Sequence, residues 1–185
     1  MDINYIFYII ASLAIGVIIL LVLRYMGGFP FPWQLRTITK RASEPDSSAL
    51  SECFSKLSNN EEIHIVMGIV NYLVCEQEIV INSLKKALER DVEIKLIHGP
   101  EVDTRSKRFL NLLGESPKAK IYRFPESPEI HFRVLIDAKG PREVYVEEPH
   151  IPYEDKGYRR ISSRRVSRQY DQIFHKMLDR CRALA

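Results

Sequence analysis

Residues 129–150 read EIHFRVLIDAKGPREVYVEEPH, and this stretch decides the fold. Two strand-like runs, 130–137 and 143–148, flank a turn formed by Lys139, Gly140 and Pro141. Side chains alternate between the two faces of a strand, so the first run has an apolar face (Ile130, Phe132, Val134, Ile136) and a mixed face (His131, Arg133, Leu135, Asp137). A His, an Arg and an Asp on one face could hold and attack a phosphate, or they could form the solvated face of an ordinary hairpin.

The N-terminal segment has the properties of a membrane anchor. Residues 5–23, YIFYIIASLAIGVIILLVL, are nineteen residues without a charge. A helix of that length crosses most of a hydrocarbon core roughly 30 Å thick. A cleaved signal peptide would need a basic start, whereas this chain begins Met-Asp-Ile-Asn. We expect an uncleaved anchor over residues 1–26 that contacts the bilayer through residues 5–23; the alternative, a buried helix, disagrees with the absence of a polar stripe.

Flanking charges predict the orientation of this anchor. The nearest basic residues all follow it: Arg24, Arg36, Lys40 and Arg41. Because basic flanks stay on the cytoplasmic side, we expect a single-pass protein of the cell membrane with its N-terminus outside. Residues 27–47 are interpreted as a linker, in which the prolines of FPFPW prevent a regular helix.

Residues 48–185 are expected to form one cytoplasmic domain. Periodicity predicts helices at 48–57, 74–90, 104–113 and 163–183, and strands at 62–67, 92–97 and 119–124 before the hairpin. Asp103 can cap the third helix and Gly114 can end it. The last helix has one apolar stripe: Val166, Tyr170, Ile173, Phe174, Met177, Leu178 and Cys181. Two strand–helix units followed by a hairpin predict an α/β fold, with a mixed sheet sandwiched by helices.

The three cysteines argue against a disulfide-rich domain and against a zinc site built on cysteine. Cys53, Cys75 and Cys181 have neither an even count nor ligand-like spacing, so neither a disulfide framework nor a zinc site is indicated. No cofactor is expected. His64, within the first strand of the domain, is interpreted as a surface or sheet-packing residue.

The element order, with a His-bearing strand after the second helix–strand unit and a closing amphipathic helix, resembles one half of a phospholipase D-like domain over residues 62–183. In that family a His-x-Lys-x-x-x-x-Asp motif supplies a His that attacks phosphorus, a Lys that binds phosphate and an Asp that supports the His. Two such motifs meet at one site, from one chain or from a homodimer. In this chain His131 matches, Arg133 replaces the Lys, and Asp137 comes one residue early.

These departures can be weighed physically. Arg133 keeps the positive charge and can bind phosphate in a bidentate manner. Asp137 comes one residue earlier than the motif requires, and in a regular strand a shift of one residue places a side chain on the other face. Asp137 nevertheless lies an even number of residues from His131, so both side chains are expected on the same face. Glu147 and Glu148 would repel a phosphodiester, and Glu148 or His150 could contact His131 across the hairpin. A metal site of His131, Asp137, Glu148 and His150 has suitable ligand types but a spacing that matches no motif.

A basic run, YRRISSRRVSR at 158–168, precedes and opens the last helix. We interpret part of it, together with His150, as a candidate binding surface for an anionic ligand such as a phosphodiester, a nucleotide or a lipid headgroup: Arg159, Arg160, Arg164 and Arg165. A solvated loop and helix face is the alternative. The run lacks interleaved aromatic residues, so it is not a nucleic-acid signature.

Three functions remain open from the sequence. The first is a membrane-anchored, homodimeric phospholipase D-like protein, catalytically degenerate, that recognises a phosphate-containing ligand or a protein partner. The second is a homodimeric, metal-independent phosphodiesterase or nuclease in which His131 is nucleophile or acid, Arg133 binds phosphate and Asp137 orients His131. The third is a structural or adaptor protein whose hairpin forms a dimer contact.

Overall fold

The structure is a computed structural model that describes residues 38–40, 46–147 and 158–183. The expected anchor at 5–23 and most of the expected linker lie outside these ranges. Within them, no helix combines the length and the apolar character needed to cross a membrane.

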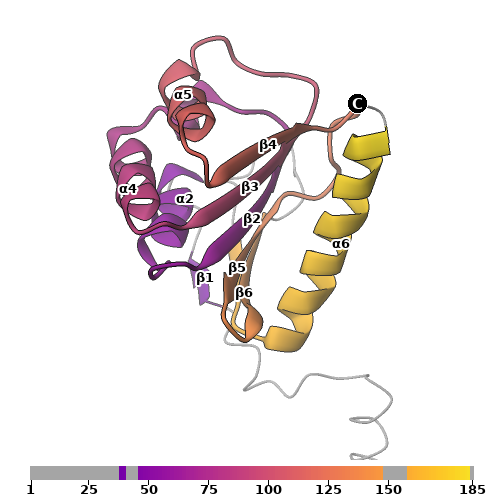
Figure 1. Cartoon of the computed structure of the whole chain (residues 1–185). Coiled ribbons are helices and arrows are strands. Elements are labelled where there is room, and N and C mark those ends of the chain that lie inside the picture. Colours follow the sequence, from indigo (N-terminus) through magenta and orange to yellow (C-terminus); the bar gives the residue numbers. More distant parts are fainter. Residues whose placement is uncertain (1–37, 41–45, 148–157, 184–185) are drawn as a thin grey trace, which may run out of the picture. The chain divides into compact units, whose positions relative to one another are not determined.

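Seven strands form one mixed sheet in the order β1-β7-β6-β5-β2-β3-β4 (Figure 1). Their bounds are Ile38–Lys40 (β1), Glu62–Met67 (β2), Glu93–His98 (β3), Ala119–Arg123 (β4), Phe132–Asp137 (β5), Gly140–Glu147 (β6) and Tyr158–Ile161 (β7). β2, β3 and β4 are parallel, and all other neighbours are antiparallel. The predicted α/β fold with a mixed sheet is confirmed.

Helices cover both faces of the sheet (Figure 1). They are α2 (Asp46–Ser55), α3 (Tyr72–Cys75), α4 (Glu78–Glu89), α5 (Lys107–Glu115) and α6 (Arg164–Ala183). α2, α4 and α5 pack on one face, and α6 packs on the other. The alternation of each strand sorts its side chains between these two layers: Ile63 and Ile65 of β2 face α2 and α4, whereas Val66 faces α6.

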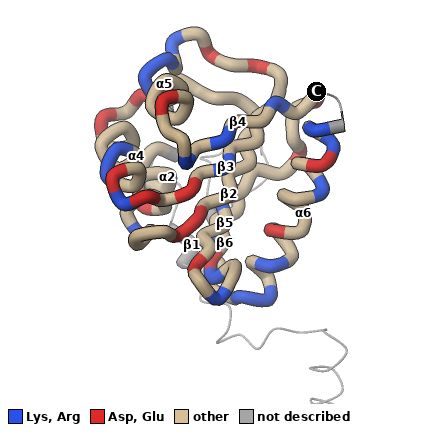
Figure 2. Tube along the Cα trace, viewed as in Figure 1, with Lys and Arg blue, Asp and Glu red and all other residues tan. Residues whose placement is uncertain are grey.

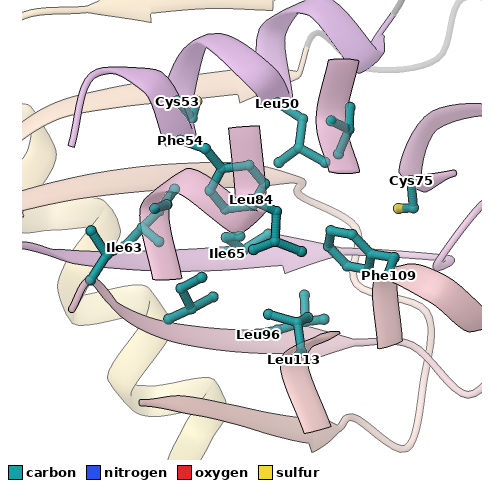
Figure 3. Close-up of a cluster of buried hydrophobic side chains, with 14 of the residues drawn as sticks. Leu50, Cys53, Phe54, Ile63, Ile65, Cys75, Leu84, Leu96, Phe109 and Leu113 are labelled. Carbon is teal, nitrogen blue, oxygen red and sulfur yellow. The ribbon is translucent and has the colours of Figure 1, made fainter. Parts of the chain in front are cut away.

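The larger of the two cores lies between the sheet and the helices α2, α4 and α5 (Figure 3). Phe54, Leu84 and Phe109 contribute one large side chain from each helix, and all three are completely buried. On the opposite face the predicted stripe of α6 packs as expected, with Phe174 buried among Val134 and Val144 of the hairpin. Burial of these apolar surfaces is the main driving force for both layers.

Two predicted helices differ from the structure by more than a shift of one or two residues at their ends. The helix expected at 74–90 is interrupted, because Gln77 has an extended backbone between α3 and α4. α5 begins after Ser106 rather than after Asp103, whose carboxylate instead accepts a hydrogen bond from the Arg105 amide at 3.0 Å. Gly114 lies inside α5 and does not end it. A short polar side chain can form such a turn in place of a helix cap, and the sequence pattern does not distinguish the two.

Two strands were not predicted. β7 lies within the basic run, for which a binding surface or a solvated loop and helix face was expected, and it pairs with β6 and with β1. β1 lies within residues 27–47, so that the expected linker contributes an edge strand to the sheet. Strands of three or four residues carry almost no periodic signal.

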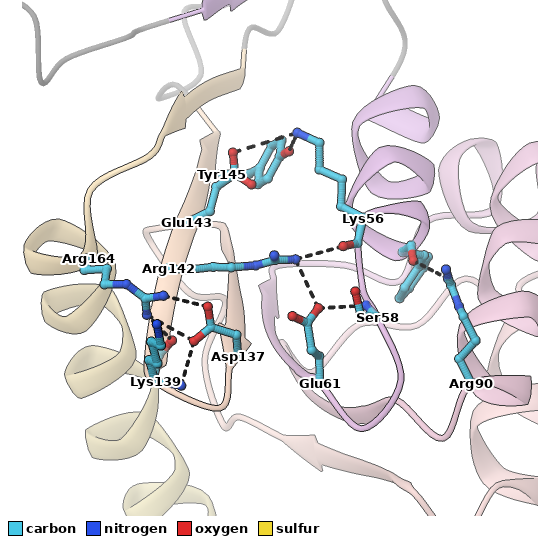
Figure 4. A network of polar contacts seen from close by, with 12 residues as sticks. Lys56, Ser58, Glu61, Arg90, Asp137, Lys139, Arg142, Glu143, Tyr145 and Arg164 are labelled. Atoms are coloured by element: carbon cyan, nitrogen blue, oxygen red, sulfur yellow. Dashed lines mark hydrogen bonds and ion pairs between the residues drawn. The ribbon is translucent and has the colours of Figure 1, made fainter.

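A β-bulge sets the register of the β5–β6 hairpin. Near the turn Ile136 pairs with Pro141, but Leu135 pairs with Glu143, so Arg142 is the extra residue. Arg142 points toward the end of α2, where it donates to the Lys56 carbonyl at 2.8 Å (Figure 4). Beyond the bulge the pairing shifts by one residue, and Glu147 instead of Val146 comes to lie across from His131.

A polar network joins α2 to the strands β6 and β7 (Figure 4). Lys56 donates to the Tyr145 hydroxyl at 2.6 Å and pairs with Glu52 at 2.7 Å. Glu143 accepts hydrogen bonds from Arg160 and from Ser162. Burial, with Cys53 and Glu52 nearby, raises the pKa of Tyr145, so the phenol stays protonated. The network satisfies polar groups that the sheet would otherwise bury without partners.

Candidate functional site

His131 lies immediately before β5, beside the carboxyl end of β2. This follows from the topology, because β5 runs antiparallel to β2 and therefore starts where β2 ends. β3 and β4 are parallel to β2, so their carboxyl ends meet at the same edge. Open α/β sheets bind their ligands outside the carboxyl ends of parallel strands. His131 is therefore at the edge where this fold presents binding groups.

Glycine allows the His131 ring to lie against the backbone at this edge. A Cβ added to Gly68 would lie 2.6 Å from His131 Nε2, 3.0 Å from its Cε1 and 3.1 Å from Ser127 Oγ. A Cβ added to Gly99, on the neighbouring strand end, would lie 2.3 Å from the Gly68 carbonyl oxygen. A Cβ at 2.6 Å from the ring or at 2.3 Å from the carbonyl oxygen would overlap those atoms, so neither position accepts a side chain. The position of the His131 ring therefore depends on these two glycines.

Both ring nitrogens of His131 face acceptors. Nδ1 lies 2.7 Å from Glu147 Oε2, and Nε2 lies 3.1 Å from the Pro128 carbonyl oxygen. The His131 side chain is 24% exposed and that of Glu147 is 9% exposed. A carbonyl oxygen can only accept, so Nε2 is the donor in a hydrogen bond to Pro128, and a carboxylate likewise accepts from Nδ1. Both ring nitrogens are therefore placed as hydrogen-bond donors.

This pattern has a direct chemical consequence. A histidine attacks phosphorus through the lone pair of one ring nitrogen, and that nitrogen must be unprotonated. In the arrangement described, His131 offers donors and no lone pair. An acceptor such as a phosphate oxygen could replace the Pro128 carbonyl at Nε2 without any change in the protonation of the ring.

Asp137 does not contribute to this arrangement. It ends β5, six residues from His131, so at about 3.3 Å per residue the two lie roughly 20 Å apart. Its carboxylate accepts from Arg164 Nη2 at 2.6 Å and Nη1 at 3.1 Å (Figure 4). The hydrogen bond from Arg164 lowers the pKa of Asp137 below its usual value. Among the described residues the carboxylate that contacts His131 is Glu147, and Asp137 joins the hairpin to the start of α6.

Arg133 lies on the same face of the sheet as His131, as the alternation predicts. It pairs with Ile65 of β2 and Tyr145 of β6, and it is 5% exposed. Arg133 is therefore almost fully enclosed by the sheet and the helices that cover this face. His131, Arg133 and Glu147 are brought together on one face.

Two arginines of the basic run, Arg160 and Arg164, bind carboxylates of the same chain. Arg160 donates to Glu143, and Arg164 to Asp137 and to the Gly140 carbonyl at 3.0 Å. Arg165 is exposed on the first turn of α6. Basic and acidic positions are interspersed along the described trace (Figure 2). The geometry thus assigns Arg160 and Arg164 to holding β7 and α6 in place.

Other predicted site residues lie outside the described residues. The side chain of Arg159, and all of Glu148 and His150, fall outside what the structure describes.

His98 is a further histidine at this edge of the sheet and was not among the predicted site residues. It ends β3, and its Nδ1 donates to the Gly99 carbonyl at 2.6 Å. Burial, aided by the nearby Arg123 charge, lowers the pKa of His98, so this ring is neutral at pH 7.

The sequence matches no protein-family model and no curated protein. Solved structures do match. TrmBL2, an archaeal chromatin protein described as showing a novel mode of DNA binding, aligns with 95% of this chain at 14% identity and a TM-score of 0.54. The shared feature is the fold. This chain spans 66% of the TrmBL2 chain, just under two thirds of its length.

Two further structures align less closely. Polyphosphate kinase from Porphyromonas gingivalis matches 71% of this chain and 21% of its own, with 16% identity and a TM-score of 0.47. NUC from Salmonella typhimurium, a phospholipase D family member, matches 74% of this chain and 91% of its own, with 10% identity and a TM-score of 0.43. Neither TM-score reaches 0.5.

Proposed function

We propose that the chain is a membrane-anchored phospholipase D-like protein whose domain binds a phosphate-containing ligand or partner and performs no phosphodiester chemistry. One observation carries the proposal: both ring nitrogens of His131 meet acceptors, in Glu147 and in the Pro128 carbonyl. A ring held in this way donates hydrogen bonds but does not attack phosphorus. The resemblance of the His131–Arg133 stretch to a phosphate-binding motif supports the choice of ligand class.

Phosphate would bind at the exposed side of His131. A phosphate oxygen would take the place of the Pro128 carbonyl, which is 3.1 Å from Nε2, while Glu147 keeps its hydrogen bond to Nδ1. Arg133, two residues along the same face, would add a second positive charge. Hydrogen bonds in which one partner is charged contribute roughly 1.5–3 kcal/mol, so the loss of the His131 donor should weaken binding about tenfold or more.

Glu147 limits what the site can do. Two like charges 4 Å apart repel by about 4 kcal/mol at an effective dielectric constant of 20. The Glu147 carboxylate is in contact with His131, so a phosphodiester placed for attack at Nδ1 would have to displace it. Binding at the Nε2 side avoids this cost, which favours Nε2 as the nitrogen that meets the phosphate.

The proposal is tested by titrating inorganic phosphate into the full chain. The chain is kept in detergent, and a chelator is present. We expect saturable binding that exceeds the effect of chloride at equal ionic strength, and about tenfold weaker binding for His131→Gln. Arg108→Gln is the matched control, because Arg108 carries a positive charge on α5 and pairs with Glu78 away from this edge. Equal affinity in wild type and His131→Gln would contradict the proposed site.

The membrane anchor is a separate part of the proposal. It rests on the uncharged residues 5–23 and the basic residues that follow them. A full-length chain should stay with membranes through alkaline carbonate extraction, and a chain without residues 5–23 should be released. Release of the full-length chain would contradict the anchor.

A second candidate, a homodimeric phosphodiesterase, is favoured by one feature of the same geometry. A carboxylate on Nδ1 is the arrangement that orients a catalytic imidazole, and Glu147 supplies at 2.7 Å the partner that Asp137 was expected to supply. This function requires Nε2 to exchange the Pro128 carbonyl for a substrate, and a second chain to supply another His131. Chelator-resistant hydrolysis by a dimer, lost in His131→Ala, would establish it.

A further inference from the structure

A cluster of histidines and carboxylates occupies the opposite face of the sheet from His131. His64 lies in the middle of β2 on the face that α6 covers, and it is 1% exposed. Its ring stacks on Phe174 with the ring centroids 4.0 Å apart and the planes at 11°. This stacking fixes the ring plane, so the directions of both nitrogens are set by the fold.

α6 presents two further metal-ligating side chains to the same point. Asp171 and His175 are four residues apart, which places them on one face of the helix. Asp171 Oδ1 lies 2.7 Å from His64 Nδ1 and 3.8 Å from His175 Nε2. One ligand atom from each of the three residues lies within 4.8 Å of the others.

The second nitrogen of His64 has a carboxylate partner. Nε2 lies 2.5 Å from Glu62 Oε1, and Lys95 in turn donates to that carboxylate. Histidines that bind metals usually donate their other ring N–H to a carboxylate, which fixes the tautomer and leaves the remaining nitrogen for the metal. Here that remaining nitrogen is Nδ1, the atom that faces Asp171.

We propose that His64 Nδ1, a carboxylate oxygen of Asp171 and His175 Nε2 bind one divalent metal ion of the zinc class, with Glu62 orienting the His64 ring. Two imidazoles and one carboxylate suit zinc and its neighbours among the transition metals, whereas magnesium and calcium prefer oxygen ligands. The site would join strand β2 to helix α6. It is independent of the phosphate proposal, because it lies on the other face of the sheet.

Two of the three distances between ligand atoms require little movement, and the third, between the nitrogens of His64 and His175, is at most 4.8 Å and would shorten as His175 turns. Zinc bonds of about 2.0–2.2 Å at tetrahedral angles place the ligand atoms about 3.3 Å apart. The His64–Asp171 separation would increase from 2.7 Å, and the Asp171–His175 separation would decrease from 3.8 Å, each by about half an ångström. The His175 side chain is 52% exposed, so it can turn to reach the ion, and a water molecule can fill the fourth position.

The test measures zinc binding by the full chain in detergent after removal of metals with a chelator. Zinc affinity is obtained by competition with a chromophoric chelator, and the ligands are read from cobalt absorption and from imidazole nitrogen chemical shifts. His175→Gln changes an exposed ligand, and Asp171→Asn is the second variant. Gln172→Ala is the matched control, because Gln172 is exposed on the same turn of α6 and lies outside the cluster. Circular dichroism establishes that each variant is folded.

We expect one zinc ion per chain, at least tenfold weaker binding in both His175→Gln and Asp171→Asn, and unchanged affinity in Gln172→Ala. Zinc should shift the nitrogen resonances of two histidines. A folded wild-type chain that binds no zinc would overturn the proposal. So would unchanged affinity in either folded ligand variant, or a cobalt spectrum with thiolate charge-transfer bands, which would place the ion on cysteine.

Discussion

Replacing Gly68 with alanine should displace the His131 ring and destabilise the domain. The new Cβ would lie 2.6 Å from His131 Nε2, far inside van der Waals contact. The ring can retreat only by giving up its hydrogen bond to the Pro128 carbonyl, worth about 0.5–1.5 kcal/mol, or the charged one to Glu147, worth about 1.5–3 kcal/mol. Overpacking of a tight site typically costs about 1–3 kcal/mol, and we expect the free energy of unfolding to fall by about that amount.

Gly114→Ala is the matched control for this prediction. A Cβ at Gly114 meets nothing within 4 Å, and the residue is inside helix α5. Alanine should therefore stabilise the domain by up to about 1 kcal/mol through helix propensity. Urea unfolding of the full chain, followed by far-ultraviolet circular dichroism, measures both variants. A Gly68→Ala chain as stable as wild type, with unchanged His131 resonances, would refute the close packing at this edge.

Three further predictions concern the rest of the domain. Leu84→Ala, at a completely buried position of α4, should lower the free energy of unfolding by about 2–5 kcal/mol in the same urea assay. Tyr145→Phe removes the hydroxyl that accepts a hydrogen bond from Lys56 and should lower the free energy of unfolding by about 0.5–1.5 kcal/mol. An unchanged free energy of unfolding would show that this hydrogen bond does not stabilise the domain. Because Arg164 lowers the pKa of Asp137, this carboxylate stabilises the fold above its unfolded pKa and loses that contribution as pH falls through its folded pKa. Asp137→Asn should therefore unfold at a lower temperature than wild type at pH 7 but show a smaller further decrease on acidification to pH 3, and parallel pH curves for the two proteins would contradict the pairing.

Much of the fold was predictable because it rests on strong periodicity. β2 was predicted at its observed bounds, and the apolar stripe of α6 packs on the sheet as expected. The interruption at Gln77 was not visible, because the residues on both sides keep helical spacing. β7 was missed because it is short and contains two arginines in sequence, and the role of one of them, Arg160, depends on Glu143 in the neighbouring strand.

The candidate site was predicted only in part, and the β-bulge explains why. The sequence placed His131 and Arg133 on one face, and the structure agrees. It could not fix which residue of β6 lies across from His131, because that depends on the extra residue at Arg142. A hairpin without the bulge would have placed Val146 there, and Glu147 would not have reached the ring.

The histidine cluster on α6 had a weaker signal. Asp171 and His175 have the four-residue spacing of helical metal ligands, but the third ligand is on a strand more than one hundred residues earlier, at His64. Only the packing of α6 on β2 brings the three together. A single Asp-x-x-x-His on a helix is common on solvated faces, so spacing alone did not identify it.

Hydrolysis of a generic phosphodiester by the full chain, with a chelator present and His131→Ala measured beside it, tests the central claim most directly. Both ring nitrogens of His131 meet acceptors, so wild type should hydrolyse the substrate no faster than His131→Ala, in preparations shown to be folded. Hydrolysis that persists in the chelator and disappears in His131→Ala would show that Nε2 becomes available for attack on phosphorus, and would contradict the claim.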